Sequence, residues 1–442
     1  MATVRSLVIA LDGVSARSFE QFSIWLPKAV ALLRQCEFSV LTTAPLTSAQ
    51  AIWAELLTGS PWWENACAGF ARPRSSLNHL DVFTEADLQQ PVTVLPNGLN
   101  VVVNTPLLQP NDSNRIWFSD GSSSRTRVIS PAALATQHAF NDYQPRAYSS
   151  VIEMLSDPVK ALDQCLNTES RRLECATKLM ETCDWQMCLL RISLFDQLEH
   201  LLGPGVDWTG NLTCADKILS FMKELDAMLS FHLQQPEEKD VWLISCFSHV
   251  PCRGRVSLNR ILRESRFTEL MSEPTNANES SARRNAALSA LSSTVRVPDR
   301  VRWSEGMLAT GKTLAASPMS GCVFINDTQR FTDGVVETED FERLRDRAAK
   351  HVSERLNAIA PGATSIFVNP SPRSTNCPVP DIVVEGKGIE FVDVEDPRMS
   401  DRDKPRSTHA AEGFVFFPAS RSGECYDEIT PIQLHNILKC GQ

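Results

Sequence analysis

Asp196 and His200 are one helical turn apart, a spacing at which two side chains on one helix face can bind the same metal ion. They directly follow the segment 185–193 (WQMCLLRIS), which we predict to be a buried strand. A carboxylate and an imidazole are typical ligands of Zn²⁺ or Mn²⁺. The same spacing also occurs in ordinary surface and capping pairs, so this pair alone leaves both interpretations open.

Three more residues with metal-ligand chemistry lie beside predicted strands. Asp12 follows the apolar run 6–11, His249 follows the strand predicted over 241–247, and His409 precedes the strand predicted over 414–417. In open α/β folds, the chemistry is concentrated just beyond the carboxyl ends of the strands. Single histidines beside strands are more often structural than metal-binding. Spacing therefore makes a metal site a hypothesis without deciding it.

The elements that would position these residues are strands alternating with helices, which predicts an α/β fold with a mainly parallel central sheet. We expect Pro27 to kink or break the first helix and Ser48 to cap the second. The predicted strands cover 6–11, 38–41, 99–104, 185–193, 241–247, 323–325 and 414–417. The predicted helices cover 17–35, 48–58, 169–183, 216–233 and 337–356.

Composition excludes several classes of protein. Among 442 residues, 43 Lys and Arg against 53 Asp and Glu give a net charge of −10, which argues against a general nucleic-acid binder. No polybasic patch suits an anionic membrane, and no apolar run reaches the roughly 18 residues of a membrane-spanning helix. The 13 cysteines include no C-x-x-C pair, so we predict reduced thiols and a cytoplasmic protein. Nothing in the sequence indicates an oligomeric state.

The metal-type residues run from Asp12 to His409, which predicts one α/β domain over residues 1–442. Residues 107–165 are rich in Ser, Asn, Pro and Asp and are predicted to form a cap or insertion. Residues 263–320 are predicted to be a second insertion. Within it, 306–313 (GMLATGKT) matches the phosphate-loop pattern, but a polar segment precedes it and Pro318 follows it closely. We therefore interpret this match as a connection rather than a nucleotide site.

Taken together, the segments resemble the type I phosphodiesterase/nucleotide pyrophosphatase group of the alkaline phosphatase superfamily, especially its predicted phosphohydrolase/phosphomutase branch found in bacteria. The resemblance implies a three-layer α/β/α sandwich with cap insertions, and two metal ions, usually zinc. The matching segments follow the family order and span nearly the whole chain. They are LVIALDG (7–13), APLTSAQAIWAELLTG (44–59), LNVVVNTPL (99–107), DWQMCLLRISLFDQLEH (184–200), VWLISCFSHVPCRGRVSLNRIL (241–262), GCVFIN (321–326), DGVV (333–336), VPDIVV (379–384) and STHAAEGFVFF (407–417).

The resemblance also implies a role for each metal-type residue. The D-x-x-x-H motif and the T-H-x-x-x-G motif of the family give one metal site, formed here by Asp196, His200 and His409. The other site of the family uses Asp12 and the S-D-H-G motif. That motif is altered here, with His249 present and Ser248 in place of the aspartate. A neutral hydroxyl binds Zn²⁺ poorly, so the second site loses a negative charge.

The nucleophile of the family is a Thr or Ser near the start of a helix. Thr47 fits the P-x-T pattern only with two extra residues before Trp53, and Ser48 is the second choice. Either residue would lie at a helix N-terminus, where backbone N–H groups favour a phosphoryl anion. The alternative is that both residues only cap the helix.

Two functions from different classes follow. The first is a zinc-dependent, or alternatively manganese-dependent, phosphoester hydrolase or phosphotransferase acting on a small phosphorylated substrate through a Thr or Ser nucleophile. The second is a repurposed or non-catalytic relative that retains one metal site and binds a phosphoester. The metal-type residues favour the first function. Ser248 and the irregular nucleophile segment favour the second.

Overall fold

A nine-stranded sheet lies at the centre of the larger part of the molecule, and five of its strands run parallel to one another side by side. The computed structural model describes residues 4–15, 24–43, 45, 48–110, 114–121, 128–145, 157–203, 215–235, 239–269, 308–370, 377–392, 407–421 and 426–440. The strand order is β19 (Glu428–Ile429), β2 (Phe38–Thr42), β18 (Glu412–Phe416), β9 (Lys239–Ser245), β1 (Arg5–Leu11), β8 (Met187–Ile192), β5 (Asn100–Val103), β6 (Arg115–Phe118) and β7 (Ile129–Ser130).

Strand β1 shows why the sheet is covered on both faces. Its side chains alternate, so Leu7, Ile9 and Leu11 enter one apolar core while Val8 and Ala10 enter the other. The first core includes helices α2 (Pro27–Leu33), α6 (Pro158–Thr182), α7 (Leu194–Leu202) and α8 (Ala215–Leu233). The second includes α3 (Ala49–Thr58), α4 (Trp62–Asn65) and α12 (Pro431–Cys440). The three-layer α/β/α sandwich with a mainly parallel sheet is therefore confirmed.

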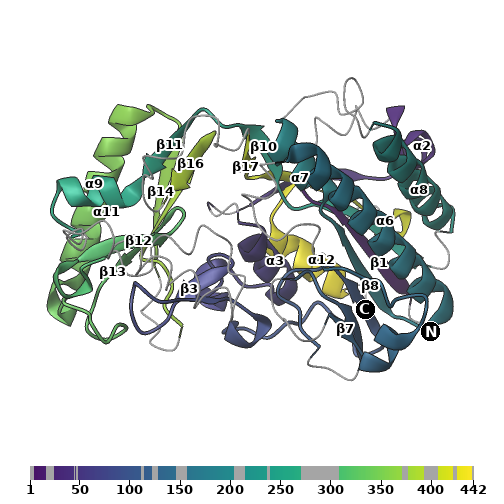
Figure 1. Ribbon diagram of the computed structural model, residues 1–442, viewed down its shortest axis with the longest axis horizontal. Coiled ribbons are helices and arrows are strands. Elements are labelled where there is room, and N and C mark those ends of the chain that lie inside the picture. Colours follow the sequence, from purple (N-terminus) through teal and green to yellow (C-terminus); the bar gives the residue numbers. More distant parts are fainter. Residues whose placement is uncertain are drawn as a thin grey trace.

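A smaller unit is inserted between two strands that pair with each other. Strand β10 (Ser248–Pro251) is antiparallel to β17 (Ser407–Ala410), and the inserted unit lies between them in the sequence. Figure 1 shows it at the end of the molecule away from α6 and α8. It has its own apolar core, formed by β11 (Gly254–Ser257), α9 (Leu258–Glu264), β12 (Ala315–Met319), β13 (Cys322–Ile325), α11 (Phe341–Ile359), β15 (Ile382–Gly386) and β16 (Ile389–Val392), with β14 (Thr364–Val368) at the sheet edge.

Hydrogen bonds tie the inserted unit to the central part of the chain. They reach the turn between the short strands β3 (Ala71–Pro73) and β4 (Leu80–Val82). The backbone N–H of Thr332 donates to the carbonyl of Ser75 at 2.8 Å, and the Ser76 hydroxyl donates to Asp333 at 2.8 Å. The inserted unit is thus held at this turn as well as at the β10–β17 pair.

The described parts of the two predicted insertions can be placed in the fold. Within 107–165, β6 and β7 extend the edge of the central sheet. Strand β6 pairs with β5, and β7 pairs with β6, so the sheet continues through this polar region of the sequence. Within 263–320, β12 belongs to the four-stranded sheet of the inserted unit, and this unit already begins at β11, before residue 263. Residues 270–307 lie outside the described residues.

Several local predictions can be compared with the structure. Helix α2 begins at Pro27, which agrees with the predicted break, because proline lacks the N–H that the first helical position leaves unused. Within the phosphate-loop match, a 3₁₀ turn over Thr310–Lys312 leads into strand β12 and not into a helix, which agrees with a connection. The cysteines in the described ranges form no disulfide. None of the described helices is long and apolar enough to cross a membrane.

Candidate metal centre

Four side chains from three separate elements converge above the carboxyl ends of β1 and β8. Asp196 and His200 come from α7, His249 from β10 and His409 from β17, and one ligand atom of each lies within 4.8 Å of the others. We call this group the histidine half of the site. The structure thus brings together Asp196, His200 and His409, which the sequence predicted as one site, and adds His249, which was expected beside Asp12.

The distances in the histidine half suit a tetrahedral metal ion. Asp196 Oδ1 is 3.0 Å from His249 Nε2, 3.1 Å from His409 Nε2 and 3.4 Å from His200 Nε2. The Nε2 atoms of His200 and His409 are 3.2 Å apart. Four ligands about 2.0 Å from a tetrahedral zinc ion would be roughly 3.3 Å from one another. These four distances therefore match the spacing of ligands around one tetrahedral ion.

Local structure explains why these residues meet. Helix α7 begins immediately after β8, so Asp196 lies in its first turn and His200 follows one turn later on the same face. In the β10–β17 pair, His249 and His409 are directly opposite each other, and opposite residues of an antiparallel pair share one face. Both strands contact α7.

Gly13 allows α7 to approach β1 closely. Its φ of +96° lies in the region that favours glycine, and an added Cβ would be 2.6 Å from the Asp196 backbone nitrogen. A side chain at this position would push the start of α7 away from the sheet. The small residue that follows Asp12 is therefore needed to place Asp196.

A hydrogen-bond chain fixes the tautomer of His249. The Ser407 hydroxyl donates to the carbonyl of Glu199 at 2.9 Å, so at 2.8 Å from His249 Nδ1 it can only accept. Nδ1 must then carry the proton, and the Nε2 of a neutral His249 presents a lone pair to the Asp196 carboxylate. Two acceptors 3.0 Å apart need a proton or a metal ion between them.

Electrostatics favour the ligand forms of both groups. Burial by itself raises the pKa of Asp196, but the interactions with the neighbouring imidazoles of His249, His409 and His200 outweigh it and hold this pKa well below its usual range. Burial lowers the pKa of His249, although Asp196 acts in the opposite direction. At neutral pH, Asp196 is therefore an anion and His249 is neutral, as a metal site requires.

The histidine half is partly exposed. The His249 side chain is 1% exposed, whereas those of His200 and His409 are 26% and 24% exposed. A small ligand could therefore approach the metal position past His200 and His409.

Asp12 lies in a second, largely buried group, which we call the arginine half: Asp12, Trp53, Arg191 and Cys246. Its Oδ2 accepts from Arg191 Nε at 2.5 Å and from Trp53 Nε1 at 3.1 Å, and its Oδ1 accepts from the Cys246 backbone N–H at 3.4 Å. Arg191 lies on β8 beside Ala10 of β1. Burial disfavours its charge, but Asp12 and Asp196 outweigh this and raise its pKa, so it remains a cation.

The remaining predicted site residues are Ser248, Ser48 and Thr47. Ser248 is buried in β10 opposite Ala410. Ser48 is the N-cap of α3, as expected, and its Oγ accepts from the Ala51 backbone N–H at 3.3 Å. Thr47 lies outside the described residues.

Sequence reasoning missed Arg191 and Ser407. Arg191 is the one charged residue in the apolar segment 185–193, and a charge inside a buried strand indicates a partner. Ser407 lies two residues before His409, on the same face of its strand. Both residues therefore carried a local signal, but neither signal identifies Asp12 or His249 as the partner.

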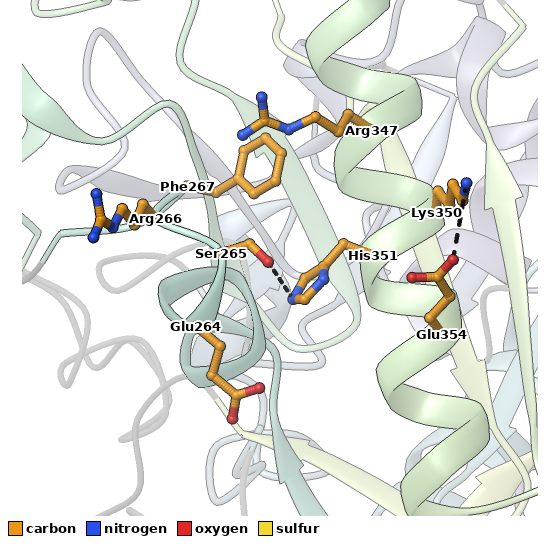
Figure 2. A pocket seen from close by; sticks show the side chains of 8 residues that line it. All are labelled: Glu264, Ser265, Arg266, Phe267, Arg347, Lys350, His351 and Glu354. Carbon is orange, nitrogen blue, oxygen red and sulfur yellow. Dashed lines mark hydrogen bonds and ion pairs between the residues drawn. The ribbon is translucent and has the colours of Figure 1, made fainter.

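A pocket elsewhere in the molecule is separate from this centre. Figure 2 shows it between α9 and α11 of the inserted unit. Ser265 and His351 are hydrogen-bonded across it at 2.7 Å, and the Arg347 guanidinium lies 4.7 Å from the centre of the Phe267 ring. None of the four residues of the histidine half lines it.

The fold is similar to those of solved hydrolase structures. Phosphonoacetate hydrolase from Sinorhizobium meliloti 1021, in complex with phosphonoacetate, is 12% identical, with a TM-score of 0.59 over 99% of this chain and 96% of that one. Murine ectonucleotide pyrophosphatase/phosphodiesterase 5, in complex with AMP, is 11% identical, with a TM-score of 0.52 over 99% of this chain and 94% of that one. Both are alkaline phosphatase superfamily members, so the alkaline phosphatase-like fold is confirmed.

At the level of sequence, no protein-family model and no curated protein matches this chain.

Proposed function

We propose that the chain is a metal-dependent phosphoester hydrolase or phosphotransferase that acts on a small phosphorylated molecule. One observation carries the metal dependence: the Nε2 of His249 and the Oδ1 of Asp196 face each other at 3.0 Å as two acceptors. A divalent ion at this position, zinc or alternatively manganese, would be held by Asp196, His200, His249 and His409.

When bound, such an ion polarises a phosphoryl oxygen and stabilises the charge that develops on it. The chain's own residues supply the rest of the reaction. We propose Thr47 as the nucleophile and Ser48 as the second choice, because the start of α3 offers backbone N–H groups to an anion. The hydrogen bond from Trp53 of α3 to Asp12 supports a site beside this helix. The Ser48 hydroxyl accepts a capping bond and still has its proton to donate.

The solved structures support the class of substrate. One of the two proteins binds phosphonoacetate and the other binds AMP, and both ligands are small molecules with a phosphorus-centred anion. An anion of this kind suits a metal ion beside a helix N-terminus. The net charge of −10 gives no support to nucleic-acid or membrane partners. We also propose a cytoplasmic protein, because the described cysteines are free.

A second candidate function is a relative that binds a phosphoester without turning it over. Two observations favour it. Four protein ligands already complete a tetrahedral zinc site, whereas catalytic zinc sites keep one position open. Ser248 also supplies no carboxylate to a second ion. Turnover would then require a fifth ligand position, on the side where His200 and His409 are exposed.

Activity assays separate the two candidates. We would assay aryl phosphate monoesters, aryl phosphate diesters and phosphonoacetate, each with metal-free protein and with added Zn²⁺ or Mn²⁺. The hydrolase proposal expects metal-dependent turnover that Asp196→Ala abolishes. Loss in Thr47→Ala with retention in Ser48→Ala would support Thr47 as the nucleophile. Binding of an aryl phosphate without turnover under any metal would contradict the hydrolase and favour the binding protein.

A further inference from the structure

The Asp12–Arg191 pair differs from what a second metal site would need. Asp12 is completely buried, and the side chain of Arg191 is 12% exposed, so the two charges are close together with little access to water. Their Nε–Oδ2 distance of 2.5 Å makes this a direct, charge-assisted hydrogen bond. The carboxylate charge is thus already balanced by a side chain of the protein.

Both oxygens of Asp12 are also engaged. Oδ2 accepts from Arg191 and from Trp53 Nε1, and Oδ1 accepts from the backbone N–H of Cys246. A metal ion bound to Oδ2 would have to displace the Arg191 or Trp53 hydrogen bond and would lie next to a guanidinium. Like charges this close in a buried site cost several kcal/mol. Asp12 therefore does not fit the role of a metal ligand.

The other ligands of a second site are missing or turned away. Ser248 is neutral, and the Nε2 of His249 faces Asp196 instead of Asp12. Cys246 offers no thiolate, because burial raises the pKa of its thiol well above the ordinary value. The residues present do not fit a second metal ion.

We propose that the Arg191 guanidinium takes the place of the second metal ion, so that the chain holds one exchangeable metal and one fixed cation. This inference rests on the proposed function, since it concerns the same site. It divides the roles of the two cations. The metal of the histidine half can exchange its ligands, whereas the guanidinium is covalently part of β8 and can only bind, orient and neutralise an anion.

The stoichiometry of bound zinc tests this inference apart from the proposed function. Metal-free protein would be loaded with excess zinc, freed of unbound ion and analysed by inductively coupled plasma mass spectrometry. We expect one zinc per chain. Two per chain would overturn the role of Arg191 and leave the proposed metal dependence intact. None would overturn the proposed function and this inference with it.

Two double variants that differ only in charge sharpen the test. In the first double variant, Arg191→Gln removes the fixed cation but keeps a side-chain N–H donor, and Ser248→Asp supplies the missing carboxylate. We expect this variant to bind two zinc ions. Adding Ser248→Asp to Arg191→Lys keeps a cation, and we expect one.

Circular dichroism of each metal-free variant checks that it is folded. If the Gln variant binds one ion, or the Lys variant binds two, Arg191 is not what excludes the second metal. If the Gln variant is unfolded, the single Ser248→Asp variant replaces it, and binding of two ions there would overturn the inference.

Discussion

The two halves of the site neutralise a carboxylate in different ways. Asp12 and Asp196 both lie near the carboxyl ends of adjacent parallel strands, one after β1 and the other after β8. Asp12 faces a guanidinium that is always charged, whereas Asp196 faces three imidazoles, one of which is fixed as an acceptor. The groups that face each carboxylate, a guanidinium or imidazoles, therefore decide whether it forms a structural ion pair or binds a metal ion.

The largest expected effect is in the histidine half. Asp196→Ala removes the only anionic ligand among the four, so we expect zinc binding to be lost. Isothermal titration calorimetry of the metal-free protein with zinc measures the zinc affinity. The matched control is Asp184→Ala, which removes an exposed carboxylate paired with Arg5 and should leave the titration unchanged. Equal zinc affinity in Asp196→Ala and wild type would contradict the assignment.

The next effect concerns the arginine half and appears as stability. Arg191→Met leaves Asp12 charged, buried and without its partner, which should cost about 3–5 kcal/mol in the free energy of unfolding of the metal-free protein. Urea unfolding followed by circular dichroism measures this. Arg5→Met, which breaks an exposed pair, should cost no more than about 1 kcal/mol. Equal losses in the free energy of unfolding would mean that the Arg191–Asp12 pair contributes no more than an exposed ion pair.

A smaller effect is expected from the residue that orients His249. Ser407→Ala removes the hydroxyl that fixes the proton on Nδ1, and we expect zinc affinity to fall by about 10–100-fold. Ser407→Thr retains a hydroxyl and should restore most of the affinity. Titration of both variants with zinc decides the point. Unchanged affinity in Ser407→Ala would show that the tautomer of His249 is set in another way.

The smallest expected effect is a pH dependence of the metal-free protein. The folded-state pKa of His249 is below its ordinary value, so below about pH 6.5 the unfolded chain takes up a proton that the folded chain resists. The contribution of His249 therefore lowers the free energy of unfolding as the pH falls, by at most about 1.4 kcal/mol per pH unit. Urea unfolding at pH 7.5 and pH 5.5 should show a smaller loss in His249→Asn than in wild type. An identical loss in both would contradict the burial argument.

Much of the fold could be predicted because its signals are local. The apolar run before Asp12 identifies β1, and Ser48 marks the start of α3 as its cap. Strands β6 and β7 were not predicted, because they are short and lie in a polar segment that becomes part of the sheet only through the pairing of β6 with β5 and of β7 with β6. Of the inserted sheet, β13 was predicted as the strand over 323–325, whereas β12, β14 and β15 were not predicted.

The site was predictable as a set of residue types but not as a geometry. The spacing of Asp196 and His200 follows from a single helix, so one turn of sequence was enough. The place of His249 depends on its register opposite His409, which no short segment encodes. The pairing of Asp12 with Arg191 likewise depends on two strands 179 residues apart becoming neighbours.

A crystal structure of the zinc-loaded protein, with an anomalous map recorded at the zinc absorption edge, tests the central claim most directly. We predict one zinc ion in contact with Asp196, His200, His249 and His409, with Arg191 still bonded to Asp12. A map without zinc at the histidine half, or one with zinc bound to Asp12 and Arg191 displaced, would contradict the account.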